Sequence, residues 1–238
     1  MKFNPTLLLA FSLSVLISCS SRQDSQSDNR FSEERTLDGV SRLKISGVFN
    51  LTITQSDQES LTIDGSPELA EKLKVTQEGD LLILELEEFN SGLFGDNELK
   101  VNLSISDLQE FEFEGVGNIK TTENFKVENI LIKGDGIGNL ALDLDAKEID
   151  AELNMMGNMS LRGKADHMKL RNEGIGNIDA SGLITQKLDL VSSGIGKVDV
   201  HCEGELSIEV NGIGKVGYTG NPTVIKEEVN GIGKVERN

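Results

Sequence analysis

The chain has 238 residues, with 40 acidic and 23 basic side chains and a formal net charge of −17. This balance argues against nucleic-acid binding and against electrostatic attachment to anionic lipid surfaces. Aromatic residues make up 4% of the chain, with no Trp and one Tyr, so we expect a core built mainly from aliphatic side chains.

Residues 1–18 have the composition of a targeting segment. One positive charge, at Lys2, precedes an apolar stretch that is too short for a membrane-spanning helix. The residues LISC, at Leu16 to Cys19, resemble a bacterial lipobox, in which cleavage precedes a lipidated cysteine. We therefore expect a lipoprotein signal peptide over residues 1–18 and lipidation of Cys19, with an ordinary secretory signal as the alternative.

Residues 19–35 are rich in Ser, Asp, Asn, Gln and Arg, which predicts a flexible tether. Several acyl chains on Cys19 would attach such a protein stably to a membrane. Loss of residues 1–18 leaves 22 basic and 40 acidic side chains, a net charge of −18. Cys202 is then the only other cysteine, so no intrachain disulfide is expected.

Residues 36–110 carry several short strand patterns. Strands are expected around Leu43–Ile45, Asn50–Thr54, Leu61–Asp64, Leu81–Leu86 and Leu99–Ile105, with a turn at Gly79 and Asp80. The residues SPEL predict a helix over Pro67–Leu73, because Ser66 suits the N-cap and Pro67 the first helical position. The seven-fold motif described next is not found in this region, and we interpret the region as irregular first coils and an N-terminal cap.

A glycine-rich motif recurs seven times between residues 111 and 238. Its form is GxGN in the first four copies, with Met155 once replacing the first Gly, and GxGK in the last three. Successive copies are 21, 19, 19, 20, 18 and 19 residues apart, which indicates a repeat array. The motif glycines are Gly115, Gly117, Gly136, Gly138, Gly157, Gly174, Gly176, Gly194, Gly196, Gly212, Gly214, Gly231 and Gly233.

Three positions in and beside the motif hold one kind of side chain in every copy. The residue between the glycines is always apolar, and so is the residue after the Asn or Lys, as Ile137 and Leu140 illustrate. We expect both columns to point inward. The residue before the motif is always polar and is expected to face water: Glu114, Asp135, Asn154, Glu173, Ser193, Asn211 and Asn230.

The segments between motifs alternate apolar and acidic residues, as in Leu140 to Asp145, which is typical of half-buried strands. No helix-length pattern separates the copies. The sequence therefore predicts an all-β fold, a parallel β-solenoid with about 19 residues per coil. We expect one domain over residues 36–238, with irregular coils over 36–110 and repeats over 111–238. The glycines are interpreted as corner residues, with positive φ at the second one.

The fourth motif position is a candidate ligand strip, formed by Asn118, Asn139, Asn158, Asn177, Lys197, Lys215 and Lys234. One interpretation is structural: the Asn amides form a hydrogen-bonded ladder, and the Lys side chains are solvated or paired with acids. The other is a cationic strip that meets an anionic partner. At the C-terminal end, either Glu236 and Arg237 protect the last strand by charge, or two ends meet in a homodimer.

The GIGN and GIGK repeats, together with ISGVFNLTITQ at Ile45 to Gln55, LTIDGSPEL at Leu61 to Leu69 and GDLLILEL at Gly79 to Leu86, resemble the putative auto-transporter adhesin, head GIN domain family. The resemblance covers about residues 38–235. It implies a right-handed, single-stranded β-helix, commonly in secreted or lipid-anchored bacterial proteins, with no known catalytic residues. Met155 and the three Lys residues depart from the pattern.

Catalysis would rest on outward acids two residues apart, Asp143 with Asp145 and Glu148 with Asp150, whose spacing overlaps that of inverting glycosidases. Such acids recur along most strands, so a solvated face is the preferred interpretation. His201 and Cys202 are adjacent and would point to opposite faces, and His167 stands alone beside Asp166, so we expect no metal site. The glycines lack a dinucleotide-binding context, and no cofactor is expected.

These observations favour a non-catalytic, lipid-anchored binding or adhesion module of the cell envelope, attached to the outer membrane through Cys19. Its partner would be an envelope or extracellular glycan or protein, not nucleic acid. The alternatives are a carbohydrate-active enzyme of pectin-lyase-like shape and a periplasmic structural lipoprotein. Display at the cell surface and display in the periplasm are both compatible with the sequence.

Overall fold

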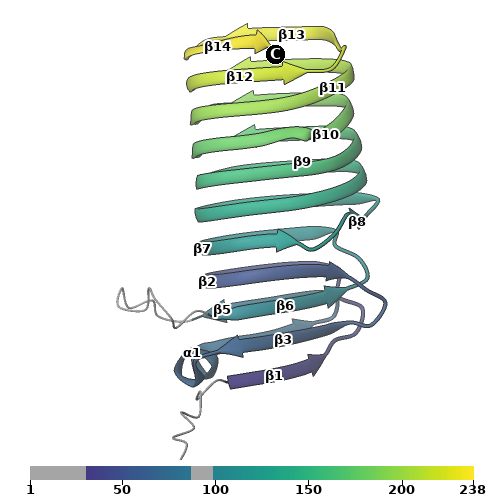
Figure 1. The fold of residues 1–238 in the computed structure, drawn as a ribbon, viewed down its shortest axis with the longest axis vertical. Coiled ribbons are helices and arrows are strands. Elements are labelled where there is room, and N and C mark those ends of the chain that lie inside the picture. The colour runs from purple at the N-terminus through teal and green to yellow at the C-terminus, as the bar shows by residue number, and fades with distance from the viewer. Residues whose placement is uncertain (1–30, 87–98) are drawn as a thin grey trace, which may run out of the picture.

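The computed structural model describes residues 31–86 and 99–238, most of which lie in β-strands. They form a parallel β-solenoid of about six turns, with coils about 20 residues apart, drawn upright in Figure 1. The predicted all-β, parallel solenoid is therefore confirmed. The predicted signal peptide and Cys19 lie outside the described residues, as does most of the predicted tether.

The described chain consists of strands and one short helix, which lies between β3 and β4. In chain order the elements are β1 (Phe31–Thr36), β2 (Arg42–Gln55), β3 (Ser60–Gly65), α1 (Pro67–Lys72), β4 (Leu73–Glu78), β5 (Leu81–Leu86), β6 (Lys100–Ile105), β7 (Glu110–Thr121), β8 (Phe125–Lys126), β9 (Asn129–Asn172), β10 (Ile175–Ser192), β11 (Ile195–Val210), β12 (Ile213–Thr219), β13 (Thr223–Val229) and β14 (Ile232–Arg237).

The N-terminal strands cover the lower end of the solenoid in Figure 1. Strands β5 and β6 pair in parallel with β2, whereas β4 pairs with β5, and β3 with β6 and β1, all antiparallel. The N-terminal end is thus less regular than the rest of the solenoid, and the predicted boundary at residue 110 stays a prediction. Strand β1 was not predicted, and residues 31–35 belong to it instead of to the tether.

The predicted short helix is present as α1. Ser66 is its N-cap, and the Ser66 hydroxyl accepts a hydrogen bond of 3.2 Å from the Leu69 backbone N–H. Pro67 occupies the first turn, where a missing N–H breaks no helical bond. The helix buries Leu69 against the core and ends before β4.

An eighth, degenerate copy of the motif lies in β2. Residues 47–50 pair in register with residues 115–118 of β7, with Phe49 in the place of the second Gly. The GxG form of the motif is absent from residues 36–110, as predicted, but this degenerate copy was not recognised there. Only the register of β2 against β7 identifies GVFN as a copy, because its single Gly is no signal by itself.

Each coil contains two strand segments joined by a bend. Residues 195–201 of β11 pair with β12, whereas residues 205–210 pair with β13, so the last complete coil consists of two separate strands. Both segments direct alternate side chains inward: Val198, Val200 and Cys202 from the first, Leu206, Ile208 and Val210 from the second. The interior is one continuous cluster, aliphatic apart from Phe, Met and Cys residues.

One of the two predicted inward columns points outward. The column after the motif is buried from Ile119 to Val216, with exposures of 1–2%, as predicted. The residues between the glycines are instead half exposed, such as Ile137 at 52% and Ile175 at 48%. Ile137 and Leu140 are three residues apart in a continuous strand, and an odd separation places side chains on opposite faces.

The motif glycines allow the backbones of successive coils to approach closely. A Cβ added to Gly176 would overlap the carbonyl oxygen of Gly157 in the preceding coil. Gly176 also has a φ of 143°, which side chains of L-residues rarely adopt. Positive φ occurs at the second Gly in five copies, as predicted, but not at Gly117 or Gly233, and it also occurs at two first glycines, Gly115 and Gly136.

In the last four copies the first Gly lies in the bend before the strand, whereas Gly115 and Gly136 lie within β7 and β9, as the second Gly lies within a strand in every copy. The corner role predicted for both glycines therefore applies only to the first Gly of those four copies. Met155 at a first position is fully buried. A Cβ at Gly134 would approach the Met155 sulfur to 2.8 Å, so the missing side chain of Gly134 makes room for Met155. This compensation explains how one copy tolerates the substitution.

The C-terminal end of the solenoid, formed by β13 and β14, places charged residues in inward columns. Glu227 pairs with Ile208, and Arg237 pairs with Tyr218 in the column that contains buried Val200. A partner stacked on this end would have to bury both charges. Inward-pointing charges are a known protection of edge strands. Arg237 is one of the two charged residues expected to protect this end, and Glu227 adds a second inward charge, whereas the homodimer stays a prediction.

Glu236 of β14 lies between Lys215 of β12 and Lys234 of β14. It accepts a hydrogen bond of 2.5 Å from Lys215 and is also paired with Lys234. The hydrogen bonds from Lys215 and Lys234 lower the pKa of Glu236 from 4.5 to about 2. The carboxylate therefore joins the last two coils.

We predict that Gly176→Val destabilises the fold more than Gly174→Val. A side chain at either position meets backbone of the preceding coil, but only Gly176 has positive φ, which adds on the order of 1–3 kcal/mol of strain. Thermal unfolding of both variants, with Ile175→Val as the outward control, measures the difference. Equal losses of stability at the two glycines would contradict this explanation.

We also predict that Glu236→Gln destabilises the last coil at neutral pH. Because the folded pKa is depressed to about 2, the contribution is present above pH 4.5 and is lost as pH falls toward 2. Hydrogen exchange of β14 amides should therefore be faster in Glu236→Gln at pH 7. Titration of the Glu236 carboxyl, followed by NMR, tests the cause directly, and a midpoint near 4.5 would rule it out.

Candidate functional site

The outer surface of the first strand segment, which we call the motif face, carries three side-chain columns. The central one is the apolar ladder, formed by the residues between the glycines. Strand register aligns Ile175 with Met156 and with Ile195, and continues in both directions along the solenoid. The exposed members are Ile137 at 52%, Met156 at 49%, Ile175 at 48%, Ile195 at 48%, Ile213 at 49% and Ile232 at 78%.

A ladder of side-chain amides runs along one border of the apolar ladder. Asn118 donates to Asn50 and Asn139 donates to Asn118, each at 2.8 Å. The bonds from Asn158 and Asn177 to the preceding Asn are longer, at 3.4 Å. The predicted Asn ladder is present, and Asn50 of the eighth copy extends it.

The three lysines that continue this column are paired with acids. Lys197 contacts Asp199 at 2.5 Å, and Lys215 and Lys234 share Glu236. A hydrogen bond from Lys197 to Asp199 raises the pKa of the lysine above its ordinary value. The lysines therefore present little uncompensated charge, which weakens the interpretation of this column as a cationic strip for anionic partners.

The other border of the apolar ladder is the polar column that precedes each motif. All of its seven members are exposed, as predicted. Asn154 donates to Asp135 at 3.2 Å and Asn230 donates to Asn211 at 3.1 Å. Its acids, Glu114, Asp135 and Glu173, all lie in the first four copies.

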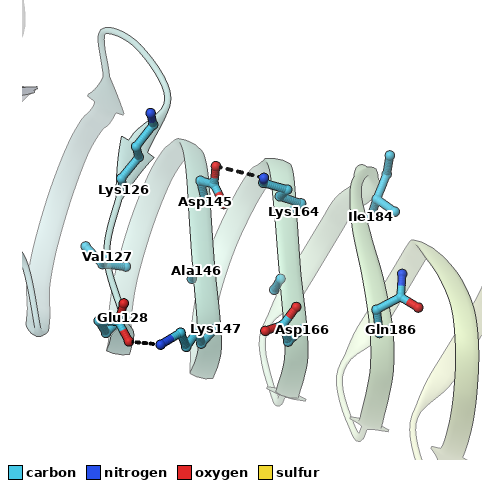
Figure 2. A pocket seen from close by; sticks show the side chains of 11 residues that line it. Lys126, Val127, Glu128, Asp145, Ala146, Lys147, Lys164, Asp166, Ile184 and Gln186 are labelled. Carbon is cyan, nitrogen blue, oxygen red and sulfur yellow. Dashed lines mark hydrogen bonds and ion pairs between the residues drawn. The ribbon is translucent and has the colours of Figure 1, made fainter.

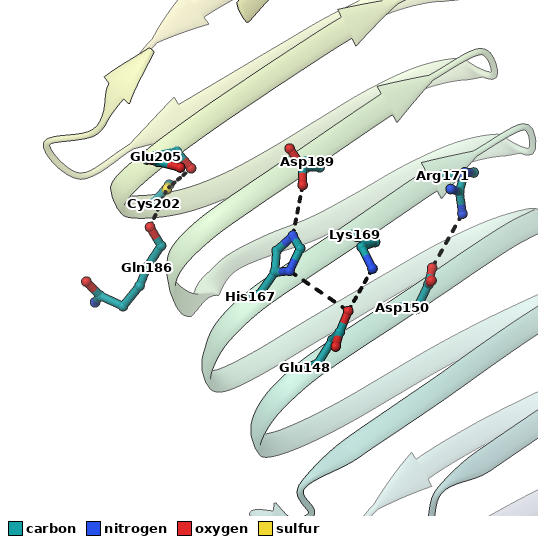
Figure 3. A network of polar contacts seen from close by, with 9 residues as sticks. All are labelled: Glu148, Asp150, His167, Lys169, Arg171, Gln186, Asp189, Cys202 and Glu205. Carbon is teal, nitrogen blue, oxygen red and sulfur yellow. Dashed lines mark hydrogen bonds and ion pairs between the residues drawn. The ribbon is translucent and has the colours of Figure 1, made fainter. Parts of the chain in front are cut away.

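The outer surface of the second strand segment has a different chemistry, shown in Figure 3. Glu148 accepts a 2.7 Å hydrogen bond from Lys169, which lowers the pKa of the Glu148 carboxyl. His167 lies between Glu148 and Asp189, with Nε2 at 2.8 Å from the Asp189 carboxylate. Arg171 contacts Glu152 at 3.1 Å. Opposite charges on neighbouring coils thus neutralise this face.

A shallow groove of about 510 Å³ follows the bend between the two segments. Figure 2 shows Ala146 on its floor and charged side chains on its rims. Charge alternates between coils: Lys164 contacts Asp145 at 3.2 Å, and Lys147 is paired with Glu128. The groove has no excess of either charge and no group set apart for chemistry.

The acids considered for catalysis are mostly held by these pairs. Asp145 contacts Lys164, Glu148 contacts Lys169, and Asp150 is 3.5 Å from Arg171. His201 lies at the surface and Cys202 is fully buried, so the two point to opposite faces as predicted. Within residues 31–86 and 99–238, no three His, Cys, Asp or Glu side chains are placed to hold a metal ion.

The described part of the chain contains no helix with the length and apolarity needed to cross a membrane. Sequence reasoning missed the exposure of the apolar ladder. The signal was present, because Ile175 is two residues from Glu173, which was expected to face water, and residues two apart in a strand lie on the same face. Apolar character alone suggested burial, and strand parity would have corrected it.

Comparison with solved structures supports the fold. A putative adhesin from Bacteroides fragilis NCTC 9343 superposes with a TM-score of 0.83 at 22% identity, over 89% of this chain and 98% of that chain. A putative lipid binding protein from Parabacteroides distasonis ATCC 8503 has a TM-score of 0.63 at 19% identity, with the same coverage of 89% and 98%.

A putative adhesin from Parabacteroides distasonis ATCC 8503 has a TM-score of 0.57 at 17% identity, over 88% of this chain and 97% of that chain. No curated protein matches the chain. The family model of the putative auto-transporter adhesin, head GIN domain, matches residues 40–222. With its stacked motif glycines, Asn ladder and solenoid in place, the chain belongs to this family.

Proposed function

We propose that this protein is a non-catalytic, lipid-anchored protein of the cell envelope that binds or adheres to a partner through the motif face. The observation that carries the proposal is the apolar ladder, which leaves six large side chains about half exposed or more in one continuous strip. Scattered exposed apolar residues need no explanation, but a contiguous strip bordered by polar side chains is typical of interaction surfaces.

The family description supports adhesion, and so do the neighbouring structures described as putative adhesins. One neighbour is described as a putative lipid binding protein, which would also require an exposed or enclosed apolar surface. An adhesive role suits a protein at the cell surface. Lipidation of Cys19 and attachment to the outer membrane are part of the proposal and rest on the LISC sequence.

A carbohydrate-active enzyme receives less support. The carboxylates at suitable spacing, such as Glu148 and Asp150, are paired with cations on neighbouring coils. A catalytic acid or nucleophile needs a carboxylate that is free to contact the substrate. The chain also has no Trp and one Tyr, so the aromatic platforms that commonly stack against sugar rings are scarce.

We predict that protease added to intact cells digests the anchored protein, because a surface adhesin must be accessible from outside. Samples of intact and lysed cells, probed with an antibody against the solenoid, measure this accessibility. Protection until lysis would place the protein in the periplasm. It would overturn surface adhesion in favour of the structural lipoprotein that was the alternative prediction.

The matched control is Cys19→Ala, which removes the acylation site and leaves every described residue unchanged. It should abolish incorporation of labelled fatty acid and shift the protein from the membrane fraction to the soluble fraction. Retention of label in Cys19→Ala would contradict lipidation at this residue.

A further inference from the structure

The surroundings of the apolar ladder differ between its two halves. The first half, which we call the acidic half, consists of Val116, Ile137, Met156 and Ile175, bordered by Glu114, Asp135 and Glu173. The second, the lysine half, consists of Ile195, Ile213 and Ile232, bordered by Lys197, Lys215 and Lys234. The two halves have the same apolar chemistry and opposite neighbouring charges.

The acidic half has the larger uncompensated charge. The three lysines pair with two carboxylates, those of Asp199 and Glu236, which leaves one positive charge in the lysine half. By contrast, among the residues that the structure describes, Glu114, Asp135 and Glu173 lie within ion-pair distance of no cation. Asp135 accepts one hydrogen bond, from Asn154. Negative potential is therefore concentrated beside four apolar side chains.

An open groove of about 600 Å³ runs along this acidic border. Its walls include Glu114, Asp135, Asn154 and Glu173 on the side of the ladder, and Lys133 and Arg171 on the other side. Arg171 is already paired with Glu152. Of these two cations, only Lys133 is then left to balance the charges of Glu114, Asp135 and Glu173. A cationic side chain that enters the groove would thus find carboxylates within reach.

The apolar ladder and its acidic border together indicate which kind of partner can bind here. A lipid surface fits poorly, because interfacial apolar strips are normally bordered by Lys or Arg and this one is bordered by acids. A second copy of the chain fits poorly as well, since each mature chain would have a net charge of −18 and the two would repel. A partner with an apolar strip bordered by basic side chains complements both features.

The spacing of the ladder suits a helix laid along the solenoid axis. Successive coils are separated by about 4.8 Å, the distance between paired strands. Apolar side chains at i, i+3 and i+4 of a helix advance by about 4.5–6 Å. Four rungs of the acidic half therefore match about three turns of an amphipathic helix.

We propose that the acidic half of the motif face is a docking site for a cationic amphipathic helix of a partner protein. The apolar face of the helix packs on Ile137, Met156 and Ile175, and its bordering Lys or Arg side chains reach Glu114, Asp135 and Glu173. The inference deepens the proposed function and rests on it for the physiological role.

The test uses the mature chain with Cys19→Ala and a synthetic peptide of about 18 residues, roughly 27 Å long as a helix, with a Leu face bordered by Lys. A scrambled peptide has the same charge without the apolar face. Fluorescence anisotropy should show that the amphipathic peptide binds about tenfold or more tightly than the scrambled one, since only the former buries apolar surface.

Matched variants locate the site. Ile137→Thr with Ile175→Thr should weaken binding by about tenfold, whereas Ile195→Thr with Ile213→Thr in the lysine half should change it less than about twofold. Thr keeps the β-branched shape at outward positions, and thermal unfolding verifies that each variant is folded. Glu114→Gln with Glu173→Gln should weaken binding and reduce its dependence on salt.

Three results would overturn the inference: equal affinity for the two peptides, equal losses in the two halves of the ladder, and a concentration-dependent dimer that disappears in Ile137→Thr with Ile175→Thr. The last would identify a second copy as the occupant. Failure of the peptide to bind a chain that protease digests on intact cells would overturn the docking site alone, because accessibility and lipidation are measured separately.

Discussion

The close approach of backbones in successive coils is the constraint on which the rest of the structure depends. Gly176 pairs in register with Gly157 below it and Gly196 above it. A side chain at this position would overlap the carbonyl of the preceding coil, so the stacking distance and the glycine column require each other. Once coils stack in register, every outward side chain lies about 4.8 Å from its counterpart in the next coil.

Equivalent side chains of successive coils then contact one another, so each column must pair its polar groups and avoid repulsion between like charges. Amides do so by donating to one another, as Asn139 does to Asn118. Like charges at this distance would repel, and the second strand segment avoids repulsion by alternating them, as in the contact of Lys169 with Glu148. Aliphatic side chains neither attract nor repel by charge, so an outward apolar column is left half exposed unless a partner covers it.

The two outer faces are consequently suited to different roles. The charge-paired face satisfies its polar groups internally, and substitution of one member would leave its counterpart unpaired. The motif face keeps its amides and lysines paired, but it leaves the apolar ladder exposed and the acids of its first half without a cation among the described residues. A rigid solenoid holds these groups at fixed spacing, which lowers the entropy lost when a partner binds.

The amino-acid sequence by itself determined the solenoid, its period, the cap helix and the Asn ladder, because each depends on local pattern repeated at a nearly constant interval. Ser66 and Pro67 are residue types that favour the start of a helix, and seven motif copies require seven equivalent layers.

The tertiary structure alone decided the inter-coil register. Coils of 18 to 21 residues contain bulges, so counting along the chain could not place His167 beside Asp189, Lys215 beside Glu236, or residues 47–50 beside residues 115–118. It also decided which apolar column faces water, since burial depends on strand parity within a packed coil and not on hydrophobicity alone.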